Sequence, residues 1–269
     1  MSDPIEIRPV SRLNASVRVP GSKSYTQRAL VIASLAEGKS LLQGPLISED
    51  TEYLVEALQV LGAEIVTAGE DLVVTGTGGI IAPPRKPIFL GNNGTATRFL
   101  IGAVSLGNGD YLLTGSPRLC QRPMKPLLEA LRALGGASTC EGEEGYLPLT
   151  IHARGIRGGR VIFGDAESSQ YISSLLISAP FASGDVEIQV RGSLASRPYV
   201  NLTLRAMKGF GVRVETCGEN HFLVRSGQRY RGTDYPVEGD ASSASYFFLA
   251  AALTRGTVRV YPLSRESLQ

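Results

Sequence analysis

Apolar residues occur along this chain in two helical patterns. Three segments, residues 29–33, 99–104 and 172–181, are apolar on nearly every side of a helix, so each must be enclosed by other elements. Three other segments carry a single apolar stripe, which predicts surface helices with one face against a sheet. The stripes are Leu54, Leu58 and Leu61, then Leu127, Leu131 and Leu134, and more loosely Val200, Leu204 and Met207. These segments end at Gly62, Gly135 and Gly211, where glycine can form a left-handed cap.

Runs rich in β-branched residues predict strands between these helices. The runs are Ile65-Val66, Leu72 to Val74, Val161 to Phe163, Val186 with Ile188 and Val190, and Val212 with Val214. After each enclosed helix the same order of elements returns: a short strand, an irregular stretch, a surface helix and then strands. We therefore expect an α/β protein with three parallel helices inside and sheets outside, in quasi-threefold symmetry.

A unit of roughly 72 residues recurs four times, as expected of a duplicated supersecondary structure. The copies open with Gly, Ser, Asn or Asp before an apolar helix, at residues 21–24, 92–95, 168–170 and 239–243. The glycines that follow these helices, at positions 38, 109, 184 and 256, lie 71, 75 and 72 residues apart. Several helix N-termini can therefore converge, and their unpaired N–H groups and partial positive charge suit a multiply anionic ligand.

The repeat also predicts the domain organisation. Three complete units span about residues 21–238, and a fourth begins at residue 239. Pro20-Gly21 and residues 236–239 bracket the complete set with residues suited to turns or hinges. We expect residues 21–238 to form a complete lobe, and residues 1–20 and 239–269 to be pieces of a second lobe whose remainder is absent.

The composition argues against several classes of function. Hydrophobic residues make up 43% and charged residues 19%, as in soluble globular proteins, and no apolar run approaches the length of a membrane span. Residues 1–20 lack the pattern of a secretory signal, so we expect a cytoplasmic protein. A net charge of +2 argues against nucleic-acid binding. Three cysteines without a CxxC pair and two histidines leave little material for a disulfide framework, a metal site or a Ser-His-Asp triad, so we expect neither metal nor cofactor.

Two cations and a hydroxyl stand at the start of the first enclosed helix: Lys23, Ser24 and Arg28. They could be an ordinary N-cap beside solvated surface charges. A cation at the positive end of a helix is, however, unfavourable by roughly 0.3–1 kcal/mol when exposed, and an anionic ligand would offset that. Both interpretations stay open on this segment alone.

The second and third helix starts offer bare backbone, arginine and hydroxyl groups. In residues 91–95, which precede Arg98, glycine lacks a Cβ and so allows a ligand to approach the backbone closely. The segment is also consistent with a simple helix start. Arg118 and Arg122 add planar guanidinium groups that suit phosphate and carboxylate. The third unit supplies the neutral donors Ser168, Ser169, Gln170, Ser196 and Tyr199.

Other polar residues read as structural. Asp240 is interpreted as the N-cap of the fourth helix in preference to a catalytic residue. Cys120 has no histidine nearby in the sequence and is interpreted as an inert thiol. The acidic pair Glu49-Asp50 is interpreted as a solvated loop.

Five motifs together resemble one known family, in order over the whole chain. The motifs are Pro20-Gly-Ser-Lys-Ser with Gln27-Arg28-Ala29-Leu30, Leu90-Gly-Asn-Asn-Gly-Thr with Arg98, Gly115-Ser-Pro-Arg with Arg122-Pro123, Ser168-Ser-Gln-Tyr and Ser196-Arg-Pro-Tyr199. They resemble the 5-enolpyruvylshikimate-3-phosphate (EPSP) synthases, a family of enolpyruvyl transferases, and the chain looks like the amino-terminal three-fifths of such an enzyme. The resemblance implies an inside-out α/β barrel lobe of three βαβαββ-type repeats with parallel buried helices, plus a truncated piece of a second similar lobe.

The resemblance also implies an activity, in the shikimate pathway to aromatic amino acids. Enzymes of this family transfer the enolpyruvyl group from phosphoenolpyruvate to the 5-hydroxyl of shikimate 3-phosphate and release phosphate. The path is addition then elimination through a tetrahedral ketal phosphate, without a metal or a covalent enzyme intermediate.

Site residues follow from the same resemblance. It implies that Lys23 contacts both substrates, that Ser24 and Arg28 hold the shikimate part and its carboxylate, and that Gln170 spans both ligands. Phosphoenolpyruvate would be bound by Gly94 and Arg122, on a wall shaped by Asn92 and Thr95. The 3-phosphate would be bound by Ser168, Ser169 and Ser196, and Tyr199 would pack beside the shikimate ring.

The sequence departs from the family pattern at Asn93, Thr97 and Phe99, which leaves open the volume of the pocket for phosphoenolpyruvate and its analogues. The acid/base aspartate and glutamate of the family would lie beyond Gln269. We therefore expect this chain to bind shikimate 3-phosphate weakly and to turn over nothing without the missing carboxy-terminal lobe.

Two alternatives remain at this point. The sister enzyme that uses UDP-N-acetylglucosamine has a Lys-Asn pair at the first helix and a reactive cysteine several residues before its loop arginine. Here Ser24 follows Lys23, and Cys120 lies only two residues before Arg122. The other alternative is a noncatalytic anion-binding half of a split protein.

Overall fold

The computed structural model of the 269-residue chain describes residue 6 and residues 9–269. The helices are α1 (Lys23–Leu35), α2 (Glu49–Val60), α3 (Gly94–Val104), α4 (Pro117–Cys120), α5 (Lys125–Ala133), α6 (Ser169–Ser178), the 3₁₀ turn η1 (Ala179–Phe181), α7 (Arg197–Gly209) and α8 (Ala241–Leu253). The strands are β1 (Asn14–Arg18), β2 (Lys39–Gln43), β3 (Glu64–Ala68), β4 (Asp71–Thr75), β5 (Ile88–Phe89), β6 (Asn108–Thr114), β7 (Ser138–Cys140), β8 (Leu149–Arg154), β9 (Gly159–Phe163), β10 (Val186–Val190), β11 (Glu215–Thr216), β12 (His221–Val224), β13 (Asp234–Pro236) and β14 (Thr257–Tyr261).

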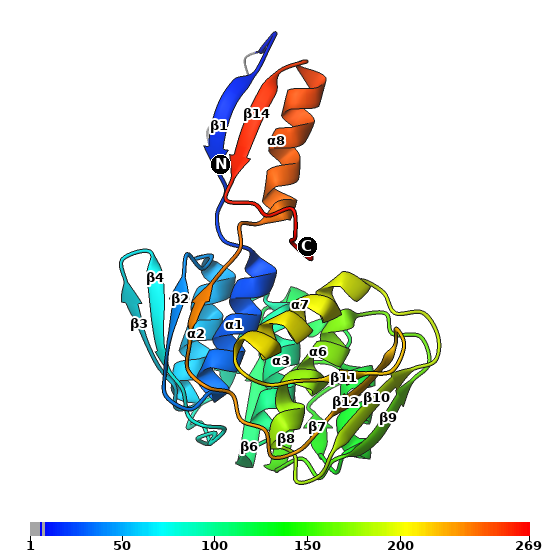
Figure 1. The fold of residues 1–269 in the computed structure, drawn as a ribbon. Coiled ribbons are helices and arrows are strands. Elements are labelled where there is room, and N and C mark those ends of the chain that lie inside the picture. Colours follow the sequence, from blue (N-terminus) through cyan, green and yellow to red (C-terminus); the bar gives the residue numbers. More distant parts are fainter. Residues whose placement is uncertain (1–5, 7–8) are drawn as a thin grey trace.

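Three four-stranded sheets share one plan (Figure 1). Their strand orders are β13-β2-β4-β3, β5-β6-β8-β7 and β9-β10-β12-β11. In each sheet the first two strands pair in parallel and the others antiparallel. The repeated topology confirms the quasi-threefold α/β arrangement that the sequence predicts.

Helices α1, α3 and α6 form the centre of the main body (Figure 1). Nearly every residue of these helices is buried, including Leu30, Leu100 and Leu176. Burying an aliphatic side chain of this size stabilises the fold by roughly 1.5–3 kcal/mol relative to leaving it exposed. The prediction of three enclosed helices with sheets outside is therefore confirmed.

The longer outer helices α2, α5 and α7 end in the same way. Beyond each helix a glycine takes a left-handed conformation, with φ of 109° at Gly62 and 89° at both Gly135 and Gly211. The following N–H then donates to a carbonyl five residues back, as Ala63 does to Leu58 at 3.0 Å, which satisfies a carbonyl that the helix leaves open. The predicted stripes face the core, and only Leu204 remains half-buried.

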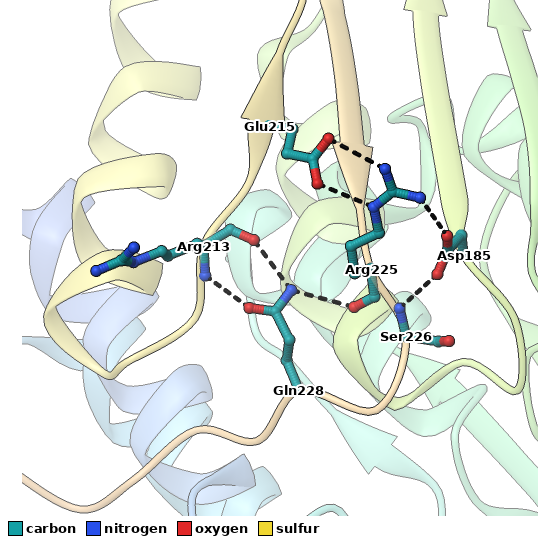
Figure 2. Close-up of polar contacts among 6 residues, drawn as sticks. All are labelled: Asp185, Arg213, Glu215, Arg225, Ser226 and Gln228. Carbon is teal, nitrogen blue, oxygen red and sulfur yellow. Dashed lines mark hydrogen bonds and ion pairs between the residues drawn. The ribbon is translucent and has the colours of Figure 1, made fainter.

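The strand predicted at Val212 and Val214 is wrong, and side chains supply the reason. The Val212 N–H closes the α7 cap by donating to the Met207 carbonyl. The Gln228 amide then pairs with Arg213, accepting from its N–H at 2.9 Å and donating to its carbonyl at 3.0 Å (Figure 2). A side chain therefore replaces the neighbouring strand, and pairing begins only at β11.

A second, smaller unit consists of β1, β14 and α8, and it projects from the main body (Figure 1). Strand β1 precedes α1 in the sequence but pairs in parallel with β14, while β13 precedes α8 but pairs with β2. The chain thus crosses between the units twice, at 19–21 and 237–239. The crossings are joined by hydrogen bonds from Ser22 N to Glu238 O (2.7 Å) and from Asp240 N to Pro20 O (2.9 Å).

Helix α8 differs from the other apolar helices because it is exposed. Tyr246 is 75% exposed and Leu253 77%, and of its residues only Ala244 is buried. Within the part of the chain that the structure describes, no helix is both long and apolar enough to cross a membrane.

Candidate functional site

The first turns of four helices meet at one small pocket. Its volume is about 130 Å³, and helices α1, α3, α6 and α7 each contribute residues to its wall. Eight of the residues singled out in the sequence line it: Ser24, Arg28, Thr95, Ser168, Ser169, Gln170, Ser196 and Tyr199. The start of α7 was not among the predicted openings, whereas the predicted fourth opening, at α8, does not line the pocket. The partial positive charges of the four N-termini therefore add up at this point.

Arg28 is the cation that lines this pocket. It is 1% exposed, and no carboxylate pairs with it among the described residues. Burial lowers the pKa of its guanidinium to about 10, so the group keeps its charge at neutral pH. A buried charge without a counter-ion is costly, and an anionic ligand in the pocket would supply the missing partner.

Hydroxyl and backbone donors lie beside that cation. Ser168 is the N-cap of α6 and accepts from the Gln170 N–H at 3.3 Å, which leaves its own proton free for a ligand. Ser196 precedes α7 in a left-handed conformation with φ of 57° and makes no capping bond with its side chain. A non-glycine residue held in this strained region is typical of functional sites. The pocket wall therefore presents two hydroxyl protons, those of Ser168 and Ser196, that make no hydrogen bond within the described part of the fold.

Gln170 connects the second and third helix starts. Its amide donates to Thr95 Oγ1 at 3.0 Å and accepts from Arg98 Nη1 at 2.5 Å. Arg98 also donates to the Pro123 carbonyl at 3.1 Å and lies over the Tyr171 ring, 5.1 Å from its centroid. Burial and the neighbouring Arg122 both lower the pKa of Arg98. The amide of Gln170 is thus fixed in orientation, although the sequence did not indicate this role for Arg98.

Gly94 and Arg122 form a second cationic wall. The Arg122 guanidinium lies against the backbone of Gly94, in the space that a Cβ would occupy. Arg122 is exposed and, among the described residues, its side chain has neither a hydrogen-bond acceptor nor a carboxylate partner. Glycine at the first position of α3 therefore allows an unpaired arginine to reach a helix N-terminus.

Lys23 occupies a different environment from the two arginines. Its ammonium forms an ion pair with Asp50 in the first turn of α2, and its N–H donates to Asp240 Oδ2 at 3.2 Å. The interpretation of Glu49-Asp50 as a solvated loop is thus wrong, because this pair begins a helix that packs beside α1. Asp240 also accepts from the Ser243 N–H at 2.7 Å, which confirms it as the N-cap of α8.

The two asparagines before α3 differ in burial: Asn93 is buried, whereas Asn92 is exposed. Asn93 caps α3 by accepting from the Ala96 N–H at 3.0 Å and donates to the Asp50 carbonyl at 2.7 Å. Its side chain is buried and is used within the fold, away from the pocket lining. Asn92 is exposed and does not line the pocket.

Several residues near the site had no signal in the sequence. Glu167 lines the pocket, and Thr203 and Ser173 lie beneath Arg28. The sequence did not indicate Thr203 and Ser173 because they lie on buried helix faces, where serine and threonine are also found as small residues of the core. The Cys120 thiol donates to the Gly115 carbonyl at 3.7 Å, and its side chain packs against the core. Among the described residues, no three His, Cys, Asp or Glu side chains cluster as a metal would need.

Larger grooves elsewhere lack the features of this pocket. One of about 870 Å³ lies along the outer side of α7, and one of about 810 Å³ lies beside the crossing segments. The cations that line them either pair with a carboxylate, as Arg205 does with Glu238 and Arg18 with Glu70, or are exposed. The small pocket is therefore the better candidate for a specific site.

Comparison with known proteins identifies the family. A model of the family EPSP synthase (3-phosphoshikimate 1-carboxyvinyltransferase) matches residues 7–269. A relative from Nostoc punctiforme, named 3-phosphoshikimate 1-carboxyvinyltransferase, is 43% identical over 99% of this chain and 63% of its own length. A protein of the same name from Sulfurovum sp. is 44% identical over 98% of this chain and 63% of its own length.

A solved structure agrees with these sequence matches. The EPSP synthase from Acinetobacter baumannii superposes with a TM-score of 0.84 at 27% identity, over 95% of this chain and 57% of that one. The chain thus spans under two thirds of the length of the proteins that it matches. The chain belongs to the EPSP synthase (3-phosphoshikimate 1-carboxyvinyltransferase) family.

Proposed function

We propose that this chain binds shikimate 3-phosphate, together with phosphoenolpyruvate, for enolpyruvyl transfer to the 5-hydroxyl with release of phosphate. The observation that carries the proposal is the buried Arg28, which faces a pocket of helix N-termini and hydroxyls without a carboxylate partner in the described part of the chain. The names of its relatives support this acceptor over UDP-N-acetylglucosamine. Charge-assisted hydrogen bonds contribute roughly 1.5–3 kcal/mol each, so a ligand with a phosphate and a carboxylate suits such a pocket.

In this assignment the pocket takes the shikimate part. Arg28, with Ser24, binds the carboxylate, because two N–H groups of its guanidinium remain without a protein acceptor. Ser168, Ser169 and Ser196 bind the 3-phosphate at the starts of α6 and α7. Tyr199 packs beside the ring, since it lines the same pocket.

Phosphoenolpyruvate lies on the second cationic wall. Its anionic groups face Arg122 and the bare backbone of Gly94 in the first turn of α3, while Asn92 and Thr95 shape that wall. Gln170 spans both ligands, because its amide lies between Thr95 and Arg98. Lys23 reaches both substrates when a ligand anion competes with Asp50 for its ammonium.

The transfer itself needs groups from the rest of a family enzyme. We propose that residues 21–238 form one lobe, and that residues 1–20 and 239–269 belong to a second. The exposed apolar side chains of α8 support this, because a helix of that composition is normally enclosed. In this view the further lobe covers α8 and supplies the acid/base residues. The chain alone therefore binds shikimate 3-phosphate but does not catalyse the transfer.

Calorimetric titration with shikimate 3-phosphate tests the proposal. We expect the wild-type chain to bind, and Arg28→Gln to bind about tenfold to a hundredfold more weakly, because a charge-assisted contact is lost. Arg154→Gln, which removes an exposed arginine outside the pocket, is the matched control and keeps the wild-type affinity. Tighter binding of UDP-N-acetylglucosamine, or equal affinity of wild type and Arg28→Gln with both variants folded, would contradict the proposal.

A further inference from the structure

Among the described residues, the hydrogen bonds of the Arg28 guanidinium all go to neutral oxygen atoms. Its Nε donates to Thr203 Oγ1 at 2.7 Å, its Nη1 to the Ser24 carbonyl at 2.9 Å and its Nη2 to the Tyr199 carbonyl at 3.1 Å. The Phe99 ring lies 5.1 Å from the guanidinium carbon and helps to fix its plane. Three of the five N–H groups are thus satisfied, and two remain for a ligand.

Thr203 is the one side-chain acceptor in this set. It is 0% exposed on α7, one turn after Tyr199. Its Oγ1 also lies 2.8 Å from Ser173 Oγ on α6 and 3.1 Å from the Tyr199 carbonyl. Because a hydroxyl can accept from Arg28 while donating its own proton to one of these neighbours, Thr203 links α1, α6 and α7 behind the pocket.

Because the Thr203 hydroxyl is a neutral acceptor, it leaves the positive charge of Arg28 available to a ligand, which a carboxylate would not do. A buried aspartate or glutamate at this position would pair with the guanidinium and cancel the charge that a ligand needs. An apolar side chain would leave the Nε–H group buried without an acceptor, which is costly, and would remove one of the three hydrogen bonds that orient the guanidinium. The hydroxyl satisfies Nε and keeps the charge available.

We propose that Thr203 is a positioning residue that orients Arg28 toward an anionic ligand while preserving its charge. The identity of that ligand rests on the function proposed above. The orientation of Arg28 does not, so it can be measured without any ligand.

Three substitutions at one position separate the contributions of shape, hydrogen bonding and charge. Thr203→Val keeps the shape and removes the acceptor, and we expect it to weaken binding of shikimate 3-phosphate about tenfold in calorimetry. Thr203→Ser restores the hydroxyl and is expected to stay within about threefold of wild type. Thr203→Asp supplies an anion beside Arg28 and is expected to abolish measurable binding.

The ligand-free readout is the arginine side-chain NMR signal of the ¹⁵N-labelled chain. In wild type we expect one Nε–H, assigned to Arg28 by its loss in Arg28→Gln, to exchange slowly with water because it is buried and bonded. In Thr203→Val that signal shifts and exchanges faster, whereas in Thr203→Ser it is retained.

The outcomes distinguish the two proposals. If wild type binds shikimate 3-phosphate and the folded Thr203→Val variant binds equally well with an unchanged Nε–H signal, the role of Thr203 is refuted. If wild type fails to bind but the signal responds as expected, the proposed substrate is wrong and the positioning of Arg28 stands. If Thr203→Val does not fold, as judged by circular dichroism, Thr203→Asp and Thr203→Ser decide: equal affinities in these two variants would overturn the proposal.

Discussion

Three arginines around the pocket carry charges that the fold leaves without a counter-ion. Arg28, Arg98 and Arg122 have no carboxylate partner among the described residues, and burial lowers the pKa values of Arg28 and Arg98. Lys23 differs, because Asp50 holds its ammonium. The sequence indicated Lys23, Arg28 and Arg122 as cations of a site. It could not indicate that Asp50 or Thr203 would contact them, since these contacts join segments that only the tertiary fold brings together.

The close contact between Gly94 and Arg122 can be tested by adding a single Cβ atom. Gly94→Ala places a methyl group where the Arg122 guanidinium lies, so we expect the guanidinium to move and binding of phosphoenolpyruvate to weaken about tenfold. Calorimetry of phosphoenolpyruvate against the chain saturated with shikimate 3-phosphate measures this effect. Gly142→Ala, where a Cβ meets open space, is the control and leaves affinity unchanged. Unchanged affinity in Gly94→Ala would show that Arg122 does not depend on that glycine.

The order of helices and strands could be predicted because each depends on its own residues. Segments that are apolar on nearly every side defined the enclosed helices, and glycines in the left-handed conformation ended the outer ones. The strand at Val212 and Val214 failed because Gln228, sixteen residues after Val212, takes the backbone groups of the residue between them. Local β propensity cannot detect that competition.

The polar cluster in Figure 2 predicts how this part of the fold responds to acid. Asp185 accepts from the Ser226 N–H and from Arg225, both at 2.9 Å, and these bonds hold the pKa of its carboxyl below the ordinary 3.8. A lowered folded-state pKa contributes stability above pH 3.8, which is lost as the pH falls through the folded-state value.

We therefore expect Asp185→Asn to melt at a lower temperature than wild type at pH 7, and the difference to close as the pH falls below 3.8. Thermal melts between pH 7 and pH 2 measure this. Asp234→Asn removes an exposed carboxyl without a side-chain partner among the described residues and serves as the control. A difference that stays constant with pH would show that the Asp185 carboxylate does not contribute through its charge.

The whole molecule has a main body and a smaller unit joined by paired crossings, and α1 starts beside these crossings (Figure 1). The repeat predicted that helix N-termini would meet, and those of α1, α3 and α6 do. It did not predict that α7 would join them in place of α8. The presence of α7 at the pocket depends on where this second helix of the third unit packs. The 72-residue period does not predict that packing.

Limited proteolysis tests the proposed division of the chain. Trypsin can reach exposed arginines at both ends, including Arg12, Arg255 and Arg259. We expect early cuts there and a resistant, folded fragment near residues 21–238, identified by mass spectrometry. Early cuts within residues 21–238, with both ends intact, would contradict the division.

We propose that helix N-termini and a few unpaired cations together bind a phosphorylated ligand. An amide-shift NMR titration of the chain with shikimate 3-phosphate tests it most directly, because each helix start reports separately. We expect saturable shifts that concentrate at the first turns of α1, α3, α6 and α7, with little change at β7 and β11, which do not line the pocket. Shifts that are absent, or that concentrate away from these four helix starts, would contradict it.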